Sequence, residues 1–164
     1  FFHSSLLVIL YLFMAVLKNI NNIPFVPILL GILGLLPFMF PLICILFSLH
    51  SINYFINLSF IYGALILSFL GSIYWGYALN INQSHLRSNS FYFWSIIPFF
   101  FGWSYFLLEK KYACICIIFG FLICQIIDEI MFYYNFFPKW FIFLRRILTA
   151  VVVSSLIYYY IKLY

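Results

Sequence analysis

Charged residues are scarce in this sequence, and acidic residues are almost absent. Only 7% of the 164 residues are charged, and three of them are Asp or Glu. Soluble domains contain about 25% charged residues. With 68% hydrophobic residues and a mean hydropathy of +1.17, a soluble fold would leave much apolar surface exposed as aggregating patches. The composition therefore excludes a soluble domain and predicts an integral membrane protein.

Short segments of alternating apolar and polar residues are also missing. A transmembrane β-barrel would show such segments, each of about ten residues. The apolar runs here are continuous and long. We therefore predict an all-α integral membrane protein, a bundle of five to six transmembrane helices.

The sequence lacks any dense basic cluster, although its formal net charge is +5. The basic residues stand singly or in pairs between apolar segments, as loop charges that set membrane topology do. This distribution gives no reason to expect a nucleic-acid partner. The partners expected from it are phospholipids and other membrane subunits.

Residues that carry catalytic or metal chemistry are few. No nucleophile–base set, zinc-ligand spacing or phosphate-binding glycine loop is present in the sequence. Cys114 and Cys116 would point about 200° apart on a helix and could not share a metal ion. The histidines fall in loops or at segment ends, which disfavours a haem held by two of them. We expect no enzyme activity, catalytic residue, metal or cofactor.

Alanine is rare, whereas phenylalanine, tyrosine, isoleucine and asparagine are abundant, with 23 Phe and 14 Tyr. Membrane helices do not require these residues in place of alanine. A preference for AT-rich codons, which is common in organellar genomes, would produce this composition. The bias predicts a mitochondrially encoded protein of the inner membrane. A bacterial inner membrane is the alternative.

Six apolar segments follow one another along the chain. The first, residues 6–17, is shorter than the roughly 20 residues needed to cross a bilayer, so it either spans or lies at the interface. Pro37 and Pro41 predict a kink in the second. Residues 80–90 form the most polar link. We divide the chain into an additional N-terminal helix and loop, 1–26, and a five-helix bundle, 27–164. The later segments are expected at 27–48, 55–79, 91–108, 112–127 and 141–164.

Small residues in the uncharged segment 62–76 predict the buried central helix. Helices in lipid associate where small side chains let their backbones approach. At about 100° per residue, several small residues fall on one side of this helix, and Leu70 falls on the other. The residues predicted to pack against neighbouring helices are Ala64, Ser68, Gly71, Ser72 and Gly76.

Asp128 and Arg145 lie on either side of the last hairpin, each about eight residues from its middle. Antiparallel packing would place them at one depth. We predict a structural ion pair, with a gate or proton-handling pair as the alternative. Arg146 points about 100° away and could reach Glu129 or a lipid head group.

Several spaced motifs resemble the transmembrane protein 69-like family. They are Gly-x-x-Gly-Leu-Leu-Pro-Phe at 31–38, Tyr-Gly-Ala-x-Ile-Leu-Ser-Phe-Leu-Gly at 62–71, Trp-Gly at 75–76 and Pro-x-Trp at 138–140. The resemblance implies a small inner-membrane protein of bacteria or mitochondria with uncharacterised function. This chain departs from the family where it has Ser72 in place of Gly, and Tyr74 in place of His or Arg.

Two functions are compatible with these patterns. The first is a non-catalytic accessory subunit that braces a larger complex of the mitochondrial inner membrane, most simply of the respiratory chain. The second is a small transporter or channel, or an assembly factor for a membrane complex. A carrier usually places charged groups near the bilayer midplane, and the middles of these segments contain none. The sequence therefore favours the structural subunit.

Overall fold

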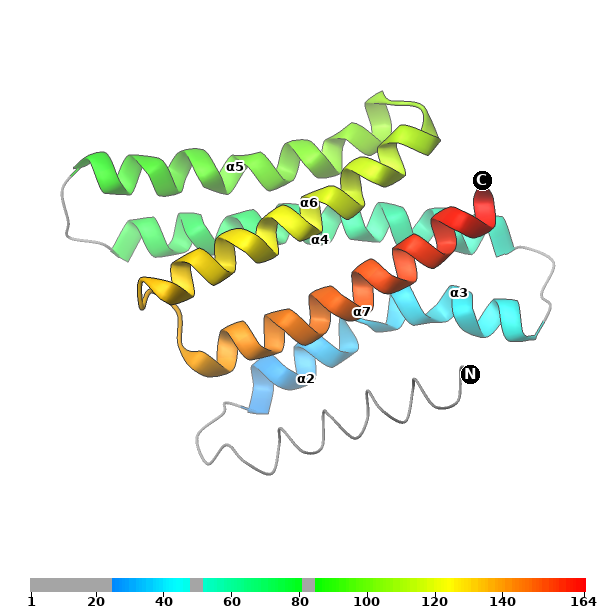
Figure 1. Ribbon diagram of the computed structural model, residues 1–164, viewed down its shortest axis with the longest axis horizontal. Coiled ribbons are helices and arrows are strands. Elements are labelled where there is room, and N and C mark those ends of the chain that lie inside the picture. The colour runs from blue at the N-terminus through cyan, green and yellow to red at the C-terminus, as the bar shows by residue number, and fades with distance from the viewer. Residues whose placement is uncertain (1–24, 48–51, 81–84) are drawn as a thin grey trace.

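The computed structural model describes residues 25–47, 52–80 and 85–164, which form helices joined by short turns, with no strand among them (Figure 1). The apolar segment 6–17 lies outside the described residues. The helices are α2 (Phe25–Leu33), α3 (Leu36–Leu46), α4 (Ile52–Asn80), α5 (His85–Leu107), α6 (Lys110–Tyr133) and α7 (Lys139–Leu163).

Among the described residues, four helical stretches are long and apolar enough to cross a membrane: Phe25–Ile45, which joins α2 and α3, and the helices α4, α6 and α7. The chain is therefore an all-α protein with the composition of a membrane bundle. α5 is not among the four. Its mean hydropathy is lower than that of these four stretches, since it contains tryptophan, tyrosine and serine residues together with Arg87 and Asn89.

The kink expected from Pro37 lies in the first of these stretches, directly before that proline. α2 ends at Leu33, and α3 begins at Leu36 with Pro37 in its first turn. Pro37 has no N–H to donate to the carbonyl of Leu33, so the α-helical ladder cannot run through this point. Pro41 lies inside α3 without ending it.

Two predicted boundaries are corrected by the structure. α5 begins at His85, so part of the polar segment 80–90 is helical and not a loop. α6 continues to Tyr133, which leaves only residues 134–138 to connect it to α7. In this turn Asn135 adopts a φ of 61°, a left-handed conformation that Asn tolerates better than most residues.

α4 is the central helix, as predicted. It packs against α3, α5, α6 and α7, and Figure 1 shows it between α5 and the layer of α3 and α7. In its most apolar stretch 44% of the residues are buried, against 17–33% in the other three candidate spans. The fully buried core includes Ile56, Phe60, Leu67, Ile117, Leu156 and Tyr159.

Small residues form a tight seam between α4 and α5. A Cβ atom on Gly71 would lie 2.1 Å from the carbonyl oxygen of Ser95, and one on Gly102 would lie 2.5 Å from that of Ala64. Ala64, Gly71 and Ala78 are all buried and follow one another at intervals of seven residues. This spacing keeps small side chains on one side of an antiparallel helix pair, where the backbones meet.

The predicted packing stripe is only partly correct. Ala64 and Gly71 lie in the seam, whereas Ser68 is half-buried and donates to the carbonyl of Ala64 in its own helix. Ser72 and Gly76 are exposed, and a Cβ on Gly76 would meet nothing within 4 Å. Ser72 and Gly76 follow Gly71 by one and five residues, and steps of about 100° and about 140° around the helix turn them away from the seam. Leu70, expected on the opposite side, is buried with 6% exposure.

The seam gives a direct test by glycine substitution. Gly71→Ala places a methyl group against the backbone of α5, and we expect it to cost about 1–3 kcal/mol of unfolding free energy. Gly76→Ala is the matched control. It meets open space and should leave stability unchanged or raise it by up to about 1 kcal/mol, since Ala favours helix. Thermal unfolding in detergent measures both, and equal effects would contradict the seam.

Candidate functional site

The hairpin of α6 and α7 brings Asp128 and Arg145 together. The Arg145 Nε donates to Asp128 Oδ2 at 2.7 Å. Both side chains are buried, with 8% and 5% exposure. The contact therefore occurs where equal distance from the turn predicts it.

Tyr74 of α4 completes a triad with this pair. Its hydroxyl donates to the other carboxylate oxygen, Asp128 Oδ1, at 2.5 Å, and its side chain is buried. From the sequence, Tyr74 stands out only as a departure from a family pattern, and this role was not predicted. A signal was available, because Tyr74 follows Gly71 by three residues and so lies on the same side of α4.

The triad ties three helices together through one carboxylate. Asp128 accepts from both partners, so neither of its oxygens is left without a donor. Phe137 and Trp94 close over Tyr74 with ring centroids 5.8 and 6.2 Å away. In such surroundings an unpaired charge is costly, whereas a hydrogen-bonded pair is tolerated. The arrangement is suited to holding α4, α6 and α7 in register.

A second ion pair joins the same two helices at the surface. Arg146 donates from Nε and Nη2 to the two carboxylate oxygens of Glu129, both at 2.6 Å. Gln125 also donates to Glu129, at 2.9 Å. The pair is largely exposed, and so contributes little to stability. Of the two partners considered for Arg146, Glu129 is the one observed, and the lipid head group stays a prediction.

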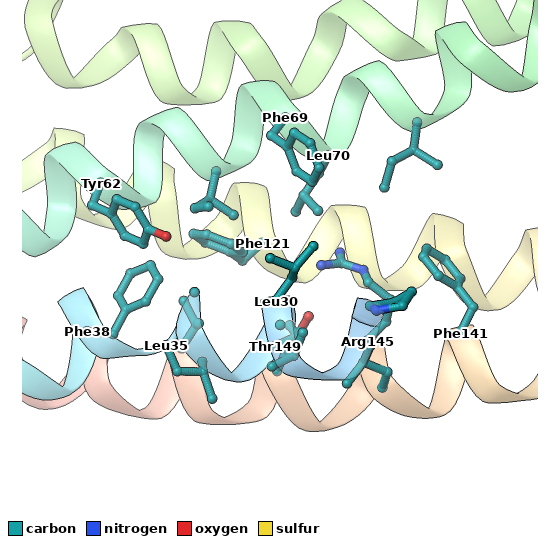
Figure 2. Close-up of a pocket in the computed structure, with 18 of the residues that line it drawn as sticks. Leu30, Leu35, Phe38, Tyr62, Phe69, Leu70, Phe121, Phe141, Arg145 and Thr149 are labelled. Atoms are coloured by element: carbon teal, nitrogen blue, oxygen red, sulfur yellow. The ribbon is translucent and has the colours of Figure 1, made fainter. Parts of the chain in front are cut away.

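A cavity of about 520 Å³ lies beside the triad, between α2, α4, α6 and α7. Its wall is almost entirely apolar and includes Gly31, Leu70 and Phe121 (Figure 2). Arg145 and Thr149, both from α7, bring polar groups to it. Arg145 thus belongs to two features at once, since it pairs with Asp128 and lines the cavity.

The other candidate ligands do not gather. Within the described ranges, no group of three His, Cys, Asp or Glu could hold a metal ion. Cys114 is buried and Cys116 is half-buried, and both are free thiols. His3 and His50 lie outside the described residues. The expected lack of a metal or cofactor stays a prediction.

A double-mutant cycle tests whether the triad acts as one unit. Asp128→Asn or Arg145→Gln alone leaves a buried charge without its partner, and each should cost about 3–5 kcal/mol of unfolding free energy. The double variant should cost less than their sum. Tyr74→Phe removes one hydrogen bond to a charged group and should cost about 1.5–3 kcal/mol.

The control for this cycle is Glu129→Gln, which breaks the exposed pair in the same hairpin. It should cost less than about 1 kcal/mol. Thermal unfolding of the purified chain in detergent measures every variant. Additive losses at Asp128 and Arg145 would contradict the coupling.

Two comparisons with known proteins bear on the identity of this chain. No solved structure was found to match this chain. A family model described as a protein of unknown function, DUF3429, matches residues 23–161. Its description names no activity, so the resemblance to the transmembrane protein 69-like family stays a prediction. The match covers every helix from α2 to α6 and nearly all of α7. The chain therefore belongs to the DUF3429 family of proteins of unknown function.

Proposed function

We propose that this chain is a non-catalytic accessory subunit of a larger complex in the mitochondrial inner membrane, one of the respiratory chain. The observation that carries the proposal is the outer face of α5. This helix is less apolar than the candidate spans, yet its outer face consists of large apolar side chains. They are Phe93, Ile96, Ile97, Phe99, Phe100, Trp103, Phe106 and Leu107.

Aromatic rings on this face are packed against one another into a rigid surface. Trp103 stacks on Phe99 with ring centroids 6.3 Å apart and lies 6.2 Å from Phe100. Rigid aromatic side chains lose little conformational freedom on association and are enriched at the centres of protein interfaces. α5 packs mainly on α4 and α6, so its far side is left for another apolar transmembrane helix.

This interface also accounts for the number of spans expected from the sequence. A helix of moderate hydropathy is stable in a bilayer when a partner covers part of it. With α5 crossing beside a partner subunit, the described part of the chain has five spans. The bias towards residues with AT-rich codons supports an organellar membrane.

The buried triad supports a structural role over a catalytic one. The Asp128 carboxylate does not line the cavity, and both of its oxygens are engaged by Tyr74 and Arg145. A general acid or base must reach the proton that it transfers. Asp128 is enclosed, and its geometry suits a brace between helices.

A small carrier is the second candidate, and the cavity favours it. Transporters bind their cargo among spanning helices, at polar groups set within the membrane. Arg145 and Thr149 are such groups in this cavity. Uptake of a labelled solute by liposomes containing the pure chain would favour this candidate over the subunit.

The subunit proposal predicts the effect of truncating the outer face of α5. The double variant Phe100→Ala/Trp103→Ala should reduce co-migration with a larger complex at least tenfold on a native gel of a mild-detergent extract. Loss of two aromatic anchors of an interface is commonly that costly. Mass spectrometry of the wild-type band identifies the host complex.

The matched control truncates two equally exposed apolar residues elsewhere, Leu65→Ala/Ile126→Ala on α4 and α6. This control should leave co-migration unchanged. Both double variants should keep the folding stability of the wild-type chain, because surface substitutions usually change it by less than about 0.5 kcal/mol each. A wild-type chain that migrates alone, away from every respiratory complex, would contradict the proposal.

A further inference from the structure

Two residues that line the cavity each carry a buried polar atom with no hydrogen-bond partner among the described residues. These atoms are Nη2 of Arg145 and Oγ1 of Thr149. Both residues are more than nine-tenths buried, at 7% and 5% exposure. They are four residues apart on α7, so their side chains leave the helix on the same side. Figure 2 shows both among apolar side chains from the surrounding helices.

The free hydroxyl of Thr149 is unusual for its position. In a helix, Thr commonly donates to the carbonyl four residues earlier, and three serines of this chain donate to carbonyls of their own helices in that way. The Thr149 hydroxyl makes no such bond. Its proton is therefore free for an acceptor that enters the cavity, which Thr149 lines together with Arg145.

The rest of the cavity selects an apolar molecule that comes from the bilayer. Leu30 and Phe69 belong to its wall and are 61% and 65% exposed, so apolar side chains surround its opening. The volume of about 520 Å³ lies within the range of about 300–1,000 Å³ that holds small organic ligands. A water-soluble ligand would lose its hydration on entry with little in the wall to replace it.

The charge balance at Arg145 selects a neutral acceptor. Its guanidinium is already paired with the Asp128 carboxylate through Nε, so the pair is neutral as a unit. A carboxylate or phosphate bound at Nη2 would add a second negative charge in a poorly solvated site. A neutral carbonyl oxygen accepts from Nη2 and from the Thr149 hydroxyl without that penalty.

We propose that this cavity binds a neutral, apolar molecule that carries a carbonyl oxygen, which accepts hydrogen bonds from Arg145 Nη2 and Thr149 Oγ1. A quinone ring and the ester of a glycerolipid share this chemistry. The two sources differ in shape, and separate probes distinguish them. The inference goes beyond the subunit role and does not depend on it.

Titration of the purified full chain in dodecyl maltoside, a detergent without a carbonyl group, tests the proposal. The probes are decylubiquinone, dioctanoylglycerol and, at pH 8, decanoate as the anionic comparison. At least one neutral probe should bind and raise the melting temperature of the chain. Decanoate should bind at least tenfold more weakly than that probe.

Thr149→Val removes the hydroxyl and keeps the shape of the side chain. Because the hydroxyl has no partner to lose, the unliganded variant should melt no lower than the wild type. Its affinity for the neutral probe should fall about tenfold, the usual effect of losing one hydrogen bond. A variant that melts normally and binds as tightly as the wild type would overturn the role of Thr149.

Ile66→Trp fills the cavity from α4, and Leu65→Trp places the same bulk on the exposed side of that helix. The first should abolish probe binding, and the second should leave it unchanged. Binding of decylubiquinone alone assigns a quinone, and binding of dioctanoylglycerol alone assigns an ester lipid. No binding by either neutral probe, tighter binding of decanoate, or equal effects of the two Trp variants would overturn the proposal.

Discussion

The Asp128 carboxylate is the constraint on which the arrangement of α4, α6 and α7 depends. A carboxylate removed from water needs a positive partner and a donor for each oxygen. Arg145 and Tyr74 meet these needs from two other helices. Any shift of α7 along α6, or rotation of α4, would break one of these bonds, so the carboxylate selects one register among many that apolar contacts alone would permit.

The seam holds α4 and α5 together in a different way, because its glycines have no side chains and let the two backbones come into contact. Helices in lipid gain little from excluding water, so their association depends on close backbone contact. Gly71 and Gly102 allow that contact, one from each helix. Gly71 and Tyr74 lie about one turn apart on α4. Close backbone packing with α5 and the hydrogen bond to Asp128 therefore both act on this helix. This explains why α4 is the most buried of the candidate spans.

Arg145 links the brace to the cavity. Its Nε donates to Asp128, its Nη2 has no partner among the described residues, and the residue lines the cavity with Leu70, Phe121 and Thr149. A ligand that engages Nη2 therefore acts on the same side chain that fixes α7 to α6. Binding in the cavity would stabilise the folded bundle by RT ln(1 + L/Kd), where L is the free ligand concentration and Kd its dissociation constant.

The sequence by itself determined the class of the protein and the contact between Asp128 and Arg145 across the last hairpin. Scarce charge and continuous apolar runs predict membrane helices whatever the packing between them. Asp128 and Arg145 are equally far from a short turn, so antiparallel packing of the two helices places them at one depth. Only the tertiary structure decided that Tyr74 joins them, that Ser72 and Gly76 turn away from the seam, and that a cavity forms beside Arg145. A helix of all-apolar composition shows no inner side by pattern alone. Which side faces a neighbour depends on how distant helices pack against it.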